Sequence, residues 1–164
     1  MAIVSYTTFN DVRAVLGVSD DELEDATLSL SVYADSLDLE LLAIGATLPS
    51  LFTATQNKPL GDRTADEKVF LMQVAQFATY HVANEVGQAL PMMPKTISDG
   101  KANMSRFADA PYRLTMERIK SKYDALHNAL EEIYATLAGT SATSAPLPTL
   151  LVGAGASIDR VTNS

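Results

Sequence analysis

Two histidines are the first candidates for chemistry in this sequence, because an imidazole side chain titrates near neutral pH and binds metal ions. His81 and His127 are the two histidines among the 164 residues, and the chain has no cysteine. Neither histidine has a second ligand nearby at a metal-binding spacing. We therefore expect each to be a partly buried helix residue, and we predict no catalytic residue, no metal site and no bound cofactor.

Two other segments match known catalytic or nucleotide-binding motifs only in part. Ser98 and Lys101 fit a serine-x-x-lysine pattern, but that motif acts at the start of a helix, and here it sits in a glycine turn. The glycine-containing run at 153–157 is followed by too little chain for the helix and second strand of a dinucleotide site. The sequence also lacks a glycine-rich phosphate loop, a GxSxG elbow and an HExxH motif. It therefore predicts a protein that is not an enzyme.

The length and composition are those of one ordinary domain. A chain of 164 residues and 17.6 kDa is large enough to bury a core without disulfides or metal ions. Its start lacks the basic and apolar regions of a secretory signal, and no run approaches the ~20 apolar residues that cross a bilayer. We therefore expect a protein that remains inside the cell where it is made and has no membrane segment.

The charge is unevenly distributed along the chain. The net charge of −8 and the pI near 4.6 argue against a general nucleic-acid binder, which presents a basic face to phosphates. Residues 1–70 carry 12 acids and 4 bases, whereas residues 71–164 carry 8 of each. In a symmetric assembly, the basic segment 95–122 could meet an acidic face or line a channel; the alternative is a solvated helix face and loop. Its bases are Lys95, Lys101, Arg106, Arg113, Arg118, Lys120 and Lys122.

Capping signals precede three stretches of helical periodicity: Thr8 with Asp11, Ser19 with Glu22, and Thr64 with Glu67. They predict a short helix that stops at Gly17, a second helical segment that reaches Gly45, and a long central helix over residues 64–90. The second segment reads either as one helix or as two, and weak helix formers at 29–32 favour a break. The central helix is apolar in nearly all directions, so we expect other helices to cover it on several sides.

The remaining periodic stretch predicts a long final helix. Asp109 is suited to its N-cap, Pro111 to its first turn and Gly139 to its end. We expect its seam to pack inside the monomer, with contact between subunits as the alternative. Residues 46–63 contain prolines, a glycine and small polar residues, and they predict a connection without a helix. The seam consists of Tyr112, Met116, Ile119, Tyr123, Leu126, Leu130, Ile133 and Leu137.

Two segments are predicted to lie outside the regular helices. Residues 91–111 hold three prolines and several methionines, so they form either an adaptable binding surface or a lid folded on the core. Residues 139–164 are rich in small residues and carry two charges, so they form either an arm that docks on another chain or a disordered tail. The side chains with which the arm would dock are Leu147, Leu150, Leu151, Val152, Ile158 and Val161.

The predicted fold class is all-α. We expect a small bundle of four to five helices over residues 1–138, with a long loop before the last helix and an extended C-terminal arm over residues 139–164.

Several phrases of the sequence, taken in order, resemble the head-to-tail connector, or adaptor, proteins of tailed bacteriophages and prophages. The resemblance covers most of residues 5–138 and is a matter of pattern and recurring phrases, with no catalytic signature. The matching phrases are TTFNDVRAVLGVSDDELEDATL, DSLDLELLAI, KVFLMQVAQFATYHVANEV, ISDGKANMSRF and the start of the last helix at ADAPY.

The resemblance implies a structural virion protein of the head–tail neck, assembled in the host cytoplasm. Such a protein forms a homo-oligomeric ring beneath the portal, commonly of twelve subunits, which extends the DNA channel and provides the platform for the tail. The expected partners are further copies of the chain, the portal protein and tail or neck proteins, and packaged DNA passes through without sequence-specific binding. The alternative is a non-viral helical binding module or a small enzyme that uses the methionine-rich loop 91–111 as a pocket.

Overall fold

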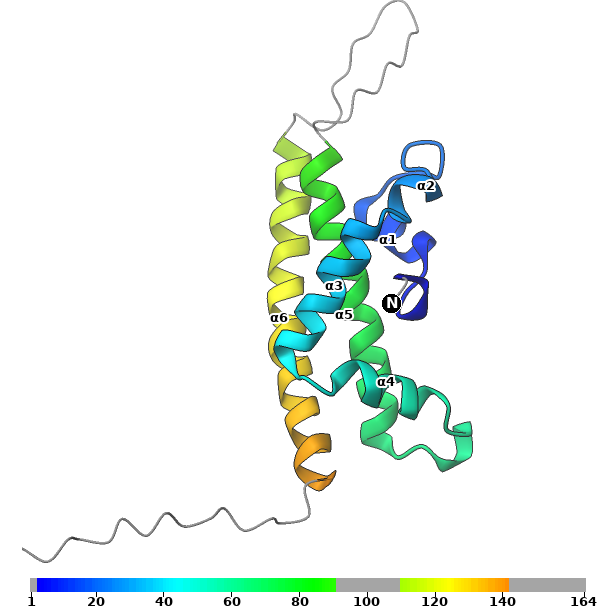
Figure 1. The fold of residues 1–164 in the computed structure, drawn as a ribbon. Coiled ribbons are helices and arrows are strands. Elements are labelled where there is room, and N and C mark those ends of the chain that lie inside the picture. The colour runs from blue at the N-terminus through cyan, green and yellow to red at the C-terminus, as the bar shows by residue number, and fades with distance from the viewer. Residues whose placement is uncertain (1–2, 91–109, 142–164) are drawn as a thin grey trace, which may run out of the picture.

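The computed structural model describes residues 3–90 and 110–141, and this part of the chain is all-α, as the sequence predicts (Figure 1). It holds six α-helices, compared with the four to five expected, and two short 3-10 helices. The elements in chain order are η1 (Ile3–Ser5), α1 (Phe9–Leu16), α2 (Asp25–Leu28), α3 (Ser31–Ile44), α4 (Leu48–Gln56), η2 (Leu60–Asp62), α5 (Ala65–Ala89) and α6 (Ala110–Ser141).

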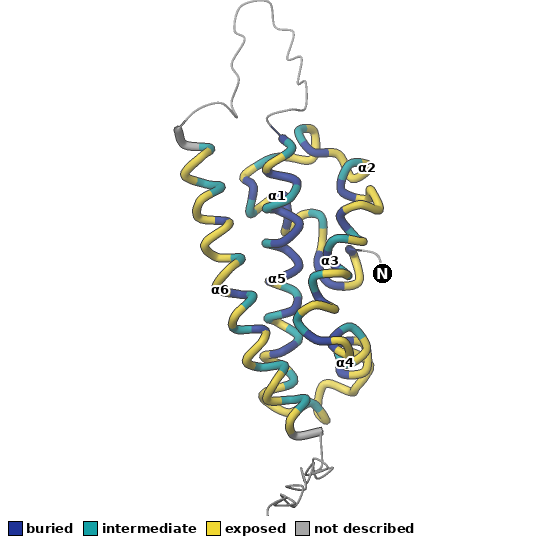
Figure 2. Tube along the Cα trace, turned by 60° about the vertical axis from the view of Figure 1, so that its left-hand side comes forward, coloured by how far each residue is buried: buried dark blue, intermediate teal, exposed yellow. Residues whose placement is uncertain are grey.

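The helix α5 lies at the centre of the bundle, with α6 beside it and α1, α3 and α4 packed around it (Figures 1 and 2). Both bonds of the predicted capping box are present: the Glu67 N–H donates to Thr64 Oγ1 at 3.2 Å, and the Thr64 N–H donates to Glu67 Oε2 at 2.9 Å. Phe70, Val74 and Phe77 are completely buried. The predicted central helix is therefore confirmed.

The long helix α6 packs along α5, so its seam is used inside the monomer, as expected. Ile119, Leu126 and Leu130 of the seam are buried, and the ring of Tyr123 stacks on Phe77 with centroids 5.4 Å apart. The expected end at Gly139 is wrong, because α6 continues through this residue to Ser141. A glycine inside a helix costs only about 0.5–1 kcal/mol relative to alanine, so it does not by itself end a helix.

The first helix, α1, follows its predicted signals closely. The Asp11 N–H donates to Thr8 Oγ1 at 3.2 Å. Gly17 has a φ of 68°, in the left-handed region that glycine enters without strain. Both predicted ends of the helix are confirmed.

The segment after α1 differs from the prediction at its start. The Ser19 N–H donates to Glu22 Oε2 at 3.0 Å, yet no helix begins there, and α2 is a single turn further on. Arg13 Nε donates to the Leu23 carbonyl at 2.7 Å, so a side-chain contact from α1 holds the segment before α2. The favoured break is confirmed, since α2 ends at Leu28 and α3 starts at Ser31.

The expectation that residues 46–63 form a connection without a helix is wrong, because they include α4 and η2. Pro49 lies in the first turn of α4, where its missing N–H costs no hydrogen bond. Leu48 and Phe52 are buried one turn apart, and the Phe52 ring lies 5.0 Å from the ring of Tyr6. Tertiary contacts on one apolar face therefore stabilise a helix that the local sequence pattern does not predict.

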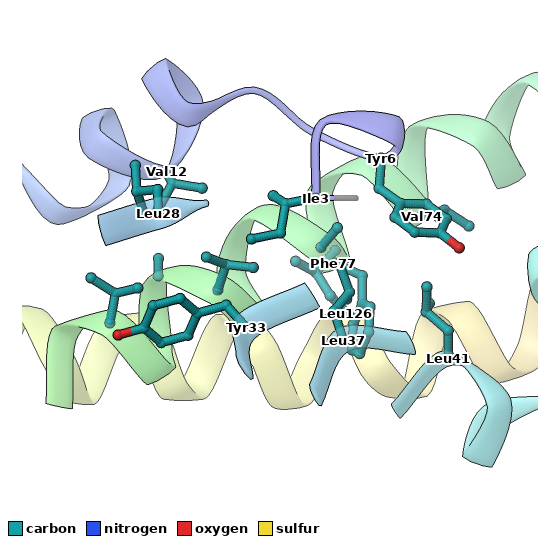
Figure 3. Close-up of a cluster of buried hydrophobic side chains, with 14 of the residues drawn as sticks. Ile3, Tyr6, Val12, Leu28, Tyr33, Leu37, Leu41, Val74, Phe77 and Leu126 are labelled. Atoms are coloured by element: carbon teal, nitrogen blue, oxygen red, sulfur yellow. The ribbon is translucent and has the colours of Figure 1, made fainter. Parts of the chain in front are cut away.

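The core is a single cluster to which most of the helices contribute (Figure 3). Figure 3 shows Leu37 of α3, Phe77 of α5 and Leu126 of α6 converging, while Tyr33 and Leu41 extend the contact along α3. Among the described residues, no single helix is long and apolar enough to cross a membrane. The helices α3 and α4 meet these criteria only together, across a bend of 100°.

Candidate functional site

The three longest helices of the bundle each contribute two polar residues, one helical turn apart, to a shared cluster. Ser36 and Glu40 come from α3, His81 and Glu85 from α5, and Tyr123 and His127 from α6. Residues four apart lie on the same face of a helix, so each pair faces the other two helices together. We call these six residues the polar cluster.

His81 is buried within the polar cluster, with 6 % of its surface exposed. The Ser36 hydroxyl donates to Glu85 Oε1, and Ser36 Oγ lies 3.2 Å from His81 Nε2. Because the single hydroxyl proton of Ser36 is used on Glu85, the oxygen accepts the proton of Nε2. Burial lowers the pKa of His81, while the Glu85 and Glu40 carboxylates act in the opposite direction. His81 is therefore a neutral imidazole at pH 7.

The other half of the polar cluster links α3 to α6. The Tyr123 hydroxyl donates to Glu40 Oε1 at 2.8 Å, and His127 Nε2 lies 3.5 Å from the same carboxylate oxygen. Burial raises the pKa of Tyr123, and the hydrogen bond to Glu40 raises it further. His127 Nδ1 also lies 3.8 Å from Glu131 Oε1 on its own helix. Half-buried polar contacts thus fix the position of α3 across the α5–α6 pair.

The polar cluster contains a serine, a histidine and a glutamate, but their geometry differs from that of a catalytic triad. In a triad the histidine takes the serine proton on one nitrogen, and the carboxylate holds the other nitrogen. Here Glu85 lies 3.6 Å from the same Nε2 that contacts Ser36. No group of three or more potential metal ligands occurs among the described residues. The cluster, as arranged here, connects three helices.

The sequence places both histidines in helices but gives no sign that they lie near one another. In the structure both rings lie close to Phe77, with centroids 5.9 Å away for His81 and 6.0 Å away for His127. The sequence does show that a carboxylate follows each histidine by four residues, Glu85 after His81 and Glu131 after His127, and this spacing predicts a contact within each helix. Ser36 and Glu40 could not be assigned to the site from local pattern.

The described bases of the predicted basic segment lie on the exposed side of the first half of α6. Arg113, Arg118, Lys120 and Lys122 are all exposed, and the sole ion pair seen for them among the described residues joins Arg113 to Glu117 at 3.8 Å. Lys95, Lys101 and Arg106 lie outside the described residues. The described part of the segment is therefore a solvated basic face in the monomer.

Two segments with predicted roles fall in the part of the chain that is not described. These are the loop 91–111 up to residue 109, which includes Ser98 and Lys101, and the arm from residue 142 onwards. The docking role of the arm stays a prediction for Leu147, Leu150, Leu151, Val152, Ile158 and Val161.

An open groove runs between α1 and α6 over the surface of α5. It consists of two adjoining hollows of about 490 and 420 Å³, which share Ala14, Val15 and Tyr80. Gln76, Thr79 and Tyr80 of α5 form the floor of the groove. Asp11 and Arg118 give the groove one charge of each sign. Its lining offers polar contacts to a ligand but no cluster of catalytic side chains.

Comparisons with known proteins give no relative to which this site can be matched. The chain matches no protein-family model, no curated protein and no solved structure.

Proposed function

We propose that this protein is a head-to-tail adaptor of a tailed bacteriophage or prophage. In this proposal it is a structural virion protein of the neck and forms a ring of twelve copies beneath the portal. The ring extends the DNA channel and carries the tail or neck proteins below it. The protein would assemble in the host cytoplasm, without a cofactor or a membrane.

The observation that carries the proposal is the order of the matching phrases along an all-α chain. The opening phrase spans α1 and α2, the acidic phrase lies in α3, the central phrase lies in α5, and the last begins α6. A ring subunit acts through its shape and its contacts, so its function needs no catalytic constellation. The polar cluster, which joins helices inside the monomer, agrees with such a role.

The division of charge gives independent support. Acids dominate the surface around α2 and α3, where the sequence has no base between Arg13 and Lys58, and the start of α6 is basic. Two surfaces of opposite charge on one chain favour head-to-tail contact between copies, which closes into a ring when the rotation per subunit fits.

The test is the mass and shape of the assembly formed with the portal protein of the same phage. Native mass spectrometry of the mixture should show a multiple of the 17.6-kDa chain, and negative-stain images should show a ring added to the portal. A single chain of 17.6 kDa that leaves the portal unchanged would contradict the proposal. That result would favour the alternative, a binding module or small enzyme built around residues 91–111.

A further inference from the structure

The helix α3 is apolar on two opposite faces. Its inner face carries Tyr33, Leu37 and Leu41, which are at most 9 % exposed. On the other side Val32, Leu39 and Leu42 are exposed by 60, 69 and 48 %. Their spacing of seven and three residues places them on one face of the helix, together with the exposed Asp35. We call Val32, Asp35, Leu39 and Leu42 the α3 stripe.

The α3 stripe stands out from the rest of the described surface. Single exposed apolar side chains are normal on a soluble protein, whereas a row along one helix marks an interaction site. Three of the nine large hydrophobic residues exposed in the described part of the chain belong to this stripe. A fourth exposed hydrophobic residue, Leu30, directly precedes α3 and is 51 % exposed. The stripe also carries the negative charge of Asp35.

A complementary surface lies on the outer side of α6. Leu114, Arg118, Ser121 and Ala125 follow one another at steps of four, three and four residues, and all are exposed. Ser121 and Ala125 have small side chains, against which larger side chains from another helix can pack. Arg118 and the neighbouring Lys122 make this face basic. We call these five residues the α6 outer face.

The two surfaces cannot cover one another within one chain. The helix α3 crosses the α5–α6 pair and contacts both helices with its inner face, whereas α6 packs along α5 (Figure 1). The α3 stripe is opposite to the side of α3 that faces the bundle. The α6 outer face, apart from Arg118 at the edge of the groove, is opposite to the side of α6 that faces α5, so the two surfaces point in different directions. A second copy can present its α6 outer face to the α3 stripe of the first.

We propose that the α3 stripe of one subunit packs against the α6 outer face of the next subunit. The proposal rests on the ring of the proposed function and names the contact that builds it. A twofold contact between two α3 stripes would place two Asp35 carboxylates in one interface with no base of α3 to pair with them. The head-to-tail contact instead sets Asp35 near Arg118 and Lys122, and it leaves each subunit with one free surface of either kind. Such a contact continues from copy to copy.

Disulfide trapping tests the contact directly, because the natural chain has no cysteine. A Leu39→Cys variant and a mass-tagged Ser121→Cys variant are mixed under mild oxidation. We expect mixed dimers to exceed both homodimers, and we expect the double variant to give a ladder of oligomers on a non-reducing gel. The control mixture replaces Leu39→Cys by Leu60→Cys, since Leu60 is 71 % exposed and lies in η2, outside both surfaces. Mixed dimers at or below the control level, or mainly Leu39→Cys homodimers, would overturn the proposal.

Self-association of the full chain, measured by sedimentation, provides the second readout. Leu39→Ala should weaken it about tenfold or more, while Leu60→Ala leaves it unchanged. Asp35→Arg and Arg118→Asp should each weaken association, and the two changes together should restore it. A ring that forms equally well in all these variants overturns the contact and leaves the proposed function standing. A chain that stays monomeric both alone and with the portal protein would contradict the contact and the proposed function together.

Discussion

Gly45 and Tyr134 lie in direct contact where the end of α3 meets the second half of α6. A Cβ atom added to Gly45 would stand 2.2 Å from Cε1 and 2.3 Å from Cζ of the tyrosine ring. The Tyr134 hydroxyl is in turn 2.8 Å from Thr47 Oγ1, a hydrogen-bond distance that ties the ring to the residues just after α3. The absent side chain of Gly45 therefore allows α3 and α6 to approach closely.

We expect Gly45→Ala to lower the free energy of unfolding by about 1–3 kcal/mol, because the added methyl group overpacks a fixed aromatic ring. Urea denaturation measures the loss. Gly61→Ala is the matched control, since no atom lies within 4 Å of its added Cβ. The loss should shrink in a Tyr134→Ala background, and an equal loss in both backgrounds would show that the ring is not the cause.

Phe77→Ala should destabilise the protein by about 3–5 kcal/mol, because it leaves a cavity where an aromatic ring is completely buried. Met72→Ala on the same helix is the control: Met72 is 58 % exposed, and we expect a change within about 0.5 kcal/mol. A loss below about 1 kcal/mol for Phe77→Ala would mean that α5 is not the centre of the core.

Arg13→Met should cost about 1–3 kcal/mol, because it leaves the buried carbonyl of Leu23 without its donor. The guanidinium also bonds Asn10 and Asp25, so the same change frees the segment between α1 and α2. Arg63→Met is the control, since Arg63 also donates to two backbone carbonyls but at an exposed site where water can replace it. Equal thermal shifts for the two variants would contradict a special role for burial.

Stability should depend on pH through His81. In the unfolded chain this group titrates at its ordinary pKa of 6.5, whereas burial lowers its pKa in the folded protein. Between the two values the unfolded state binds more protons. The free energy of unfolding should therefore fall as the pH drops below 6.5, with a slope approaching about 1.4 kcal/mol per pH unit. Urea titrations between neutral and mildly acidic pH should show a weaker slope for His81→Gln, and an unchanged slope would refute this origin.

A chain that ends at Ser141 should fold but fail to join the portal. Within the described part of the chain, the hydrophobic core cluster is complete before Ser141, so we expect the melting temperature to shift by less than about 4 °C. Binding should be lost if the apolar residues after Pro146 dock on the partner. Co-sedimentation with the portal protein measures this, and full binding by the shortened chain would place the docking surface elsewhere.

Local signals in the sequence were sufficient to predict the ends of the helices that have strong caps. Thr8 and Gly17 bound α1, and Thr64 with Glu67 starts α5, because these side chains and backbone angles act within one turn. By contrast, α4 buries Phe52 against Tyr6, and Arg13 of α1 holds the segment before α2 through the Leu23 carbonyl. Such contacts join residues that are distant in the sequence, so no local pattern reveals them.

The same distinction applies to the polar cluster. The spacing of His81 and Glu85 is visible in the sequence, but Ser36 lies 45 residues before His81. Glu40 lies 83 residues before Tyr123, its hydrogen-bond partner. Only the packing of α3 across α5 and α6 brings these side chains together.

The helices α1, α3, α4 and α6 cover α5 and therefore also control the hydrogen–deuterium exchange of its backbone amides. An amide in the middle of α5 can exchange only when the surrounding helices separate, so its exchange rate reports the global opening of the protein. The three residues of η2, none of which is buried, exchange through small, local openings. A single exchange experiment therefore measures two free energies of opening: that of global unfolding at the centre of the protein, and that of local opening at its edge.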